Sequence, residues 1–421
     1  MSEKPTSIVP LLRKALERIR STPPRVIASP PTQPRRAAVA LIIRVVPPPH
    51  VVVDQTHCPS LAEFFEQDWV SDPFARPEIL FLQRENQTAP EDSGMSRVRN
   101  NKEAHVAFPG GRTEADDEGG LYTAMRQTWE EIGIDLAEKD YTCVGQLDDR
   151  EITTSLGKRL LMILSPFVFL QVTPHAAAPD PVAATTLHWT PLASLVSANP
   201  PPKWSTVTVD AASRIAPKHS TALRLLVQAL VGSMEFPAII VEPSSVSPVT
   251  PDGKPAHDME KGFKPPQQLK LWGLSLGMTL DLMSYMVHPS PTESAEPRSG
   301  ASSPLSPIMQ LPYQTGAEGI RMDIVAPSLA SVFPRFSYPD VNMWIWRVLF
   351  PVFGKRYREV VRGWEASVRG GGVNDRRINW SGSALSTFYA AIRKALVLVI
   401  VARALGIIFG LGFAVWWVFR T

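Results

Sequence analysis

Residues 108–134 combine glycines, carboxylates and an arginine at spacings that could do chemistry on a phosphate group. The segment opens with Phe-Pro-Gly-Gly at 108–111, passes through an acidic run and continues into a stretch of helical period. The polar positions of that stretch are Arg126, Gln127, Glu130 and Glu131. Hard divalent cations prefer clustered carboxylate oxygens, and phosphate oxygens bind those cations in turn. The segment is therefore predicted to hold a divalent cation against a phosphate.

The stretch after residue 120 is predicted to be an amphipathic helix. Its apolar stripe, at about 100° per residue, contains Leu121, Ala124, Met125, Thr128 and Ile132. The polar residues fall on the opposite side. Arg126 precedes Glu130 by four residues, so the two side chains should pair on the helix surface. Asp116 to Glu118 supply acids at the N-terminus of this helix, and Gly133 stands where a left-handed C-cap is expected.

A charged helix face alone is more often a solvated surface than a ligand site. The flanking residues favour a ligand site here, because Gly110 and Gly111 form a turn whose backbone can approach a ligand closely. The glycine turn, the acidic run and the spacing Arg-x3-Glu-Glu-x-Gly are together far more specific for a phosphate site than any one of them.

The segment resembles the Nudix box, whose pattern is Gly-x5-Glu-x7-Arg-Glu-U-x-Glu-Glu-x-Gly-U, where U is apolar. Counted back from Gly133, the matching positions are Arg126, Glu130, Glu131 and Ile134. Counted from Gly111, one extra residue precedes the helix. This longer loop, with its Phe-Pro-Gly-Gly lead-in, resembles the coenzyme A diphosphatase branch of Nudix hydrolases. Similar elements of that branch are 163–168, which follows Leu147-Asp148-Asp149, and Trp272-Gly273-Leu274.

The resemblance implies a metal-dependent diphosphatase that hydrolyses the diphosphate of coenzyme A or of a related nucleoside diphosphate derivative, with ADP-ribose as an alternative substrate. Mg²⁺ or Mn²⁺ is the implied cofactor. The implied metal ligands are Glu130, Glu131 and the backbone of Gly111. The implied catalytic residues are Arg126, Gln127 and Glu130. The implied phosphate-binding residues are Gly110, Gly111 and Arg112.

The chain departs from the family pattern at Gln127, where the pattern has Glu. A glutamine offers one carbonyl oxygen and no charge, so it cannot act as a carboxylate base and it weakens a Mg²⁺ site. Either Asp117 or Glu118 could fill the acid position before the helix. Other acids that could complete the metal site are Asp116, Asp148, Asp149 and Glu151. The alternative function is a catalytically weak Nudix scaffold that binds a nucleotide or a protein partner at a membrane.

The overall composition excludes several classes of site but selects no partner. The 43 Lys and Arg residues nearly balance 40 Asp and Glu residues, so the net charge of +3 does not favour a polyanion, and no nucleic-acid partner is expected. The two cysteines, Cys58 and Cys143, provide neither a disulfide framework nor a Cys-x2-Cys motif, and the eight histidines show no zinc-ligand spacing.

The pattern of apolar residues predicts an α+β fold in which a mixed sheet lies between helices, as the Nudix resemblance also implies. The expected strands are 37–46, 79–82, 142–147 and 160–171. The expected helices are 7–20, 221–232 and 276–286. For 7–20 we prefer a helix that packs on the domain over a transit peptide or an interfacial helix, and Glu3 and Glu17 argue against a transit peptide.

Clusters among the 41 prolines divide the chain into blocks. The expected blocks are an N-terminal helical and Pro-rich lead at 1–29, a Nudix domain at 30–287, a low-complexity linker at 288–320, a basic juxtamembrane region at 321–394 and a transmembrane helix at 395–419. The polar insert 84–104 is expected to be a mobile loop. The Pro/Ser-rich segments 243–267 and 288–307 are expected to be disordered.

Residues 395–419 form an apolar run with one charge, Arg403. At about 1.5 Å per residue such a helix can span a ~30 Å hydrocarbon core, and Trp416 and Trp417 stand where an aromatic belt would be. Gly406 and Gly410 have a spacing that could bring two membrane helices together in a homodimer. The alternative is a buried helix of a soluble domain.

Many basic residues precede this apolar run, whereas Arg420 is the basic residue that follows it. The positive-inside rule therefore predicts that the Nudix domain lies in the cytosol. The target organelle does not follow from the residues. Residues 343–350, which contain Trp344 and Trp346, are either an interfacial element or a small packed helix.

Overall fold

The computed structural model describes most of the chain. The described residues are 7–30, 35–51, 53, 58–84, 103–153, 159–174, 176–197, 201–211, 220–242, 268–287, 335–369 and 383–420. The inserts expected at 243–267 and 288–307 and the linker expected at 288–320 lie outside these residues, as does most of the loop expected at 84–104.

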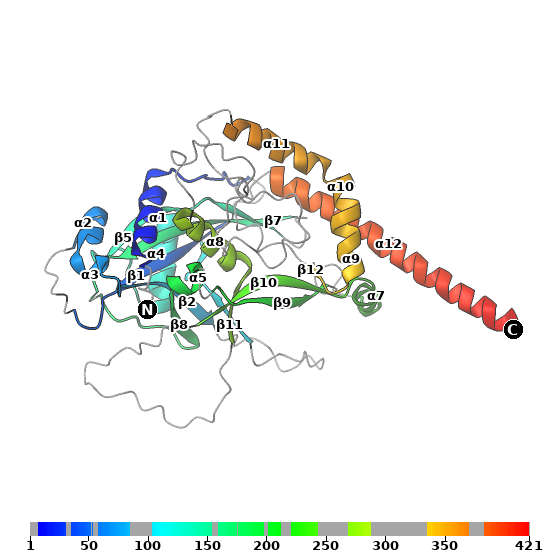
Figure 1. Cartoon of the computed structure of the whole chain (residues 1–421), viewed down its shortest axis with the longest axis horizontal. Coiled ribbons are helices and arrows are strands. Elements are labelled where there is room, and N and C mark those ends of the chain that lie inside the picture. The colour runs from blue at the N-terminus through cyan, green and yellow to red at the C-terminus, as the bar shows by residue number, and fades with distance from the viewer. Residues whose placement is uncertain are drawn as a thin grey trace, which may run out of the picture.

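Within the described residues, one mixed sheet of 12 strands organises the fold (Figure 1). The strands are β1 (Arg36–Val46), β2 (Arg76–Arg84), β3 (Glu103–Ala107), β4 (Gly110–Arg112), β5 (Tyr141–Gln146), β6 (Arg150–Thr153), β7 (Leu160–Gln171), β8 (Thr185–Pro191), β9 (Trp204–Asp210), β10 (Ser233–Val241), β11 (Gln268–Trp272) and β12 (Arg335–Phe336). Their order is β12-β10-β11-β3-β2-β1-β7-β5, and β4, β6, β8 and β9 pair beside β1, β7, β2 and β10 respectively.

The helices pack on both faces of this sheet or follow it in the chain. They are α1 (Val9–Ser21), α2 (Leu61–Glu66), α3 (Asp68–Ser71), α4 (Gly120–Ile132), α5 (Leu192–Val196), α7 (Thr221–Val231), α8 (Gly273–Val287), α9 (Pro339–Met343), the π-helical η6 (Trp344–Leu349), α10 (Phe350–Phe353), α11 (Lys355–Arg369) and α12 (Ser383–Arg420).

Strand β1 lies at the centre of the sheet and separates two hydrophobic cores. It pairs in parallel with β7 and antiparallel with β2 and β4. Successive side chains of a strand point to opposite faces. Leu41 and Ile43 therefore join the core that contains α1 and α8, whereas Ala40 and Ile42 join the core under α4. This arrangement confirms the predicted mixed sheet between helices.

The apolar pattern located the elements that it predicted, but it missed β8, β9, β10 and α11, which have 7, 7, 9 and 15 residues. Each expected strand and helix forms, and α1 packs against α8 and β5 with Leu12 and Leu16 fully buried, as expected for a helix that packs on the domain. The pattern missed short strands such as β4. Two of the three β4 residues are glycines, which have low strand propensity, and β4 forms because its neighbour β1 supplies partners for Gly110, Gly111 and Arg112.

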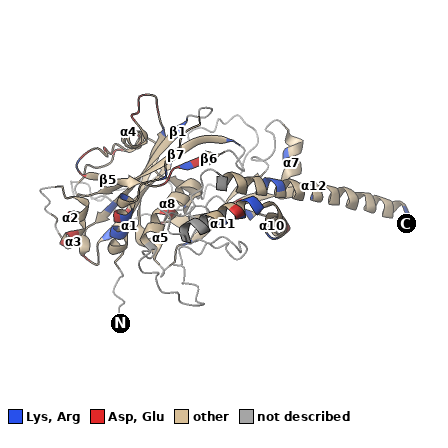
Figure 2. Ribbon diagram, turned by 90° about the horizontal axis from the view of Figure 1, so that it is seen from above, with Lys and Arg blue, Asp and Glu red and all other residues tan. Residues whose placement is uncertain are grey.

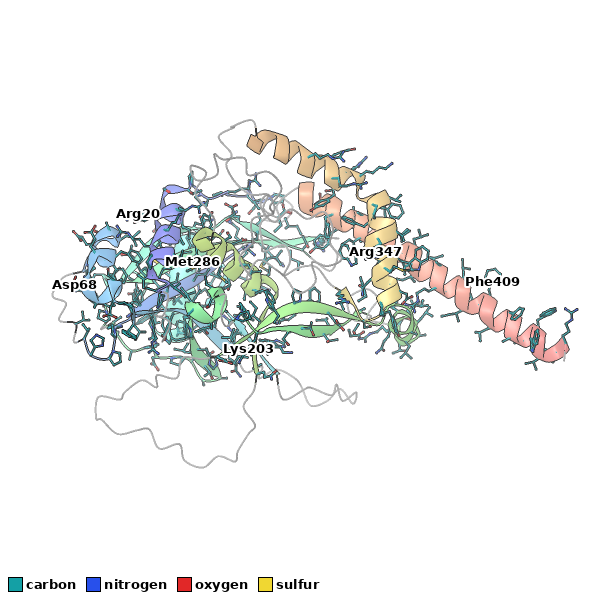
Figure 3. The ribbon with its side chains drawn as sticks, in the orientation of Figure 1. Arg20, Asp68, Lys203, Met286, Arg347 and Phe409 are labelled. Atoms are coloured by element: carbon teal, nitrogen blue, oxygen red, sulfur yellow. The ribbon has the colours of Figure 1, made fainter. Side chains whose placement is uncertain are left out.

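Helix α12 is one continuous helix that begins before the predicted span (Figure 1). Its first part packs on the domain, since Ala395, Leu396 and Val399 are buried with residues of α7, β10 and η6. The remainder projects away from the rest of the molecule, and Phe409 on this part is 73% exposed (Figure 3). The stretch Ser386–Arg420 has the length and composition of a helix that could cross a membrane.

Residues 343–350 form a packed helix rather than a wholly exposed interfacial element. Ile345 is fully buried, and Trp346 and Leu349 pack against the same cluster. Trp344 is 46% exposed on the outer side. The structure thus favours the packed-helix interpretation while leaving one tryptophan at the surface.

Candidate functional site

Helix α4 carries the predicted site and packs over β1, β4 and β7. Gly133 ends the helix in the left-handed conformation, with φ +67°, which confirms the expected C-cap. The backbone of Asp180 closes the end, because its N–H donates to the carbonyl of Ile132 over 2.9 Å. The C-terminal half of the site is therefore held at a defined position above the sheet.

The buried face of α4 differs from the expected stripe by one position. Ala124, Thr128 and Ile132 are buried as predicted, but Leu121 is 38% exposed and Thr123 is fully buried in its place. The hydroxyl of Thr123 donates to Asp117, which lies 2.9 Å away. A polar residue occupies the buried position because the acidic run folds over this end of the helix and offers it a partner.

Arg126 is the centre of the site's hydrogen-bond network. Its Nε and Nη2 donate to the two carboxylate oxygens of Asp117 over 2.7 and 2.8 Å, and its Nη1 donates to both oxygens of Glu130 over 3.0 and 3.1 Å. The same Nη1 lies 3.2 Å from Glu114, and Nη2 reaches the carbonyl of Arg112. The predicted pairing of Arg126 with Glu130 is confirmed.

The structure shows which acid of the run stands before the helix. Asp117 is the partner of Arg126 and its side chain is 2% exposed, whereas Glu118 is exposed. No acid occupies the first turn of α4, so the expected capping by residues 116–118 does not occur. The acid position before the helix therefore contributes a buried ion pair rather than a cap.

The guanidinium of Arg126 holds the pKa of the Asp117 carboxyl well below its usual range. The backbone N–H of Glu114 and the hydroxyl of Thr123 donate to the same carboxylate and act in the same direction, while burial opposes them. Asp117 is thus a permanently charged anchor at neutral pH and has no role as a proton donor.

Gly110 is required by its backbone contacts, and Gly111 lies against a side chain of α4. A Cβ on Gly110, whose φ is +148°, would lie 2.3 Å from the carbonyl oxygen of Ala38 on β1. A Cβ on Gly111 would lie 2.0 Å from Oε1 of Gln127. The backbone of the turn therefore fits between β1 and the polar face of α4, and the side-chain amide of Gln127 lies against Gly111.

The two box carboxylates have separate basic partners. Glu130 accepts hydrogen bonds from Arg126 and from Nε2 of Gln127, which lies 3.1 Å away. Glu131 is bound by both Nε and Nη2 of Arg84 at the end of β2, the latter over 2.7 Å. Sequence reasoning missed Arg84, which is 47 residues from Glu131 and was visible only as the basic end of a buried strand.

Asp148 and Asp149, considered as additional metal ligands, are engaged elsewhere. The fully buried Asp149 accepts from Nη2 of Arg36 over 2.7 Å and from the hydroxyl of Ser165 over 2.7 Å. Asp148 accepts from the backbone N–H of Arg25. Both carboxylates tie the segment before β1 to the strands around β7.

The donor types of the site fit a hard cation, although one acid is lacking. Glu130 and Glu131 offer carboxylate oxygens from one turn of α4, and Gln127 stands where a third carboxylate would complete the set. Among the residues that the structure describes, no three His, Cys, Asp or Glu side chains gather into a metal-binding group. A cation on Glu131 would also have to displace Arg84.

Comparison with known proteins adds a relative and several distant structural likenesses. No protein-family profile matches the chain. An uncharacterised protein of Schizosaccharomyces pombe is 29% identical over 228 residues, which is 53% of this chain and 61% of that protein. The alignment thus spans less than two thirds of that relative's length.

Two solved structures illustrate the structural likenesses. The NUDIX domain of Shewanella oneidensis NrtR, complexed with ADP ribose, is 15% identical, with a TM-score of 0.22 over 38% of this chain and 74% of that one. A NUDIX hydrolase from Alicyclobacillus acidocaldarius is 18% identical, with a TM-score of 0.21 over 39% and 81% of the two chains. Likenesses this distant carry no weight for function, which must be argued from the residues of the site.

We predict that Asp117→Asn lowers the free energy of unfolding at pH 7 by about 1.5–3 kcal/mol, because it removes charge-assisted hydrogen bonds from Arg126. The folded-state pKa of Asp117 is depressed, so its stabilisation is complete above the unfolded pKa of about 3.9 and is lost as the pH falls below it. In urea unfolding, the free energies of unfolding of variant and parent should therefore differ by a constant amount above about pH 5. This difference should disappear in acid.

The matched control is Glu118→Gln, which neutralises the exposed neighbouring acid. This variant should have the same urea midpoint of unfolding as the parent, within experimental error, at each pH. If Glu118→Gln lowered the free energy of unfolding as much as Asp117→Asn does, the assignment of the buried ion pair to Asp117 would be contradicted.

We predict that Arg84→Gln tightens the binding of Mn²⁺ by about three- to tenfold, where tenfold corresponds to about 1.4 kcal/mol. The variant removes the guanidinium that competes with a cation for Glu131. Titration of the full chain followed by electron paramagnetic resonance of free Mn²⁺ measures the affinity. Arg76→Gln, at the exposed start of the same strand, makes the same change in net charge and should have no effect.

Proposed function

We propose that the chain is a membrane-anchored Nudix diphosphatase that cleaves a nucleoside diphosphate derivative, with coenzyme A as the preferred substrate and ADP-ribose as the alternative. The observation that carries the proposal is the geometry around Arg126. This residue joins the acid before the helix, Asp117, to the box glutamate Glu130 and to the backbone of the glycine turn. The box spacing in the sequence thus corresponds to one connected group of side chains.

Each residue of the group has a distinct task in this proposal. Arg126 orients Glu130, and Asp117 holds Arg126 in place. Glu130, Glu131 and the carbonyl of Gly111 would hold Mg²⁺ or Mn²⁺, which supplies charge neutralisation at the diphosphate and acidifies a bound water. The turn residues Gly110 and Gly111, with Arg112, line the phosphate side.

Gln127 limits the acid–base chemistry that this group can perform. Its neutral amide cannot accept a proton from water as a carboxylate does, and it donates to Glu130 instead. The proton released by the attacking water must therefore pass to one of the remaining box carboxylates. We expect slow turnover for this reason.

A second function is favoured by two features of the charge in the site. Gln127 lowers the negative charge of the site, and Arg84 neutralises Glu131 without a cation. Together they describe a site that could bind the phosphates of a nucleotide without hydrolysing it. The second proposal is therefore a catalytically weak scaffold that binds a nucleotide or a protein partner at a membrane.

We predict that Gln127→Glu raises turnover of coenzyme A by about tenfold, the effect of about 1.4 kcal/mol on a barrier, because the metal gains an anionic ligand. Purified full chain in detergent is assayed with Mg²⁺ and with Mn²⁺ for release of adenosine 3′,5′-bisphosphate, and ADP-ribose is tested in parallel. Glu131→Gln should remove most activity, whereas Glu138→Gln, an exposed acid beyond the helix, should not.

The two proposals separate in the same assay. Metal-dependent turnover by the parent supports the diphosphatase. Substrate binding without turnover in the parent, restored by Gln127→Glu, supports the scaffold. Equal turnover by parent and Glu131→Gln under saturating Mg²⁺ would reject the metal assignment.

The membrane anchor in this proposal is the projecting part of α12. Its side chains from Leu405 onward are exposed on all sides of the helix, and Phe419 is 87% exposed. Exposed apolar surface of this extent requires cover, and a bilayer provides it without a protein partner. Basic residues precede the span, so the positive-inside rule again places the site on the cytosolic side.

We predict that the full chain resists extraction by carbonate, whereas a chain that ends at Ala404 is released. The truncation keeps Arg403 and the buried residues Leu396 and Val399, so the packing on the domain is preserved. Release of the full chain would identify a peripheral helix. In sealed vesicles with the cytosolic face outward, protease should digest the Nudix box, and protection of the box there would reverse the topology.

A further inference from the structure

Arg403, the one charge inside the predicted span, is bound to the folded domain. Its Nη1 donates to the carbonyl of Leu230 at the end of α7 over 2.6 Å. Its guanidinium also lies 4.7 Å from the ring centroid of Tyr338 and 3.6 Å from a carboxylate oxygen of Asp340 at the start of α9. Helix α12 is therefore fixed to the domain at this residue.

This contact shortens the stretch of α12 that is free to enter a bilayer. The helix from 405 to 419 has 15 residues and a length of about 22 Å at 1.5 Å per residue. A hydrocarbon core is about 30 Å thick. A span shorter than the core draws the protein surface around its base towards the lipid, or thins the bilayer there.

The surface around that base carries exposed apolar residues on three helices, α7, η6 and α10. The exposed large apolar residues of α7 are Leu223, Leu225 and Leu226, and those of η6 and α10 are Trp344, Val348 and Val352. We name these six residues the collar. Helix α7 is seen nearly end-on beside α12 in Figure 1 and lengthwise in Figure 2, so it lies across the emerging helix rather than along it. An apolar helix in this orientation runs parallel to a membrane that α12 enters.

The charges near the collar suit an anionic lipid surface. The basic residues of η6, α11 and the packed part of α12 are Arg347, Lys355, Arg356, Arg358, Arg362, Arg393 and Lys394, against few acids such as Glu359. Figure 2 shows blue basic positions on the domain half of α12 and on α11, whereas the projecting half of α12 carries no charge except at its tip. Basic residues near an anionic lipid surface are attracted to it.

We propose that the collar inserts into the interfacial layer of an anionic bilayer and docks the domain against it in one orientation. This inference rests on the proposed membrane anchoring, and adds to it a second contact and a fixed distance between the domain and the lipid. A bilayer is preferred over a second protein copy, because the helices that carry the collar contact α12, whose apolar side chains are exposed from Leu405 onward. Trp344 is the kind of side chain that favours the headgroup layer.

The test measures the depth of single labelled positions on the full chain. Cys58 and Cys143 are replaced by serine, and one cysteine is introduced by Leu225→Cys, Val348→Cys, Phe413→Cys or Phe74→Cys. Each variant carries an environment-sensitive fluorophore in vesicles of phosphatidylcholine and phosphatidylglycerol. Phe413 reports the projecting helix, and Phe74, 60% exposed in the segment after α3, reports an aqueous surface.

We expect a lipid-borne nitroxide near the headgroups to quench labels at 225 and 348 several-fold more than a label at 74, and aqueous iodide to quench them correspondingly less. Labels at 225 and 348 that behave as the label at 74 does, with 413 in lipid, would overturn the collar and leave the anchor intact. A label at 413 that iodide reaches would overturn both. Protection at 225 from both quenchers would indicate a protein partner and also overturn the proposal.

Discussion

The paired hydrogen bonds between Arg126 and Asp117 are the constraint on which the site depends. They hold one charge of each sign at the start of α4, and removal of Arg126 would leave the buried carboxylate of Asp117 without a cationic partner. Because the remaining nitrogen of the guanidinium reaches Glu130, the same residue sets the direction of the box carboxylate. The turn is held as well, through the carbonyl of Arg112. One guanidinium thus connects three segments that the chain alone would leave independent.

The site balances its charge through arginines. Glu130 is paired with Arg126 on the same helix, and Glu131 is paired with Arg84 at the end of strand β2. A divalent cation would make the same electrostatic contribution with stricter geometry, so cation and Arg84 are competitors for one carboxylate. Gln127 reduces the total negative charge and makes the arginine-paired state more favourable relative to the cation-bound one. In the proposed metal-binding function, the affinity for a cation would depend on Arg84, outside the box, as well as on the box carboxylates.

The charge on Arg403, at the other end of the molecule, is also balanced by groups of the folded domain. Arg403 in an isolated membrane helix would be costly at mid-bilayer. The domain removes this cost, because Leu230, Asp340 and Tyr338 provide an acceptor, an anion and an aromatic face for the guanidinium. The same contacts determine where α12 leaves the protein surface. A charge that argued against a membrane helix is therefore an attachment point between the helix and the domain.

Local patterns within the sequence determined β1, β7, α1 and α4, the left-handed cap at Gly133, the pairing of Arg126 with Glu130 and the apolar character of α12, because each depends on residues a few positions apart. Only the tertiary structure decided between Asp117 and Glu118, placed Arg84 on Glu131 and divided α12 at Arg403. These depend on strands and loops distant in sequence, whose approach no local period encodes. Short strands such as β4 belong to the same class, since a strand of three residues is stabilised by its neighbour rather than by its own propensity.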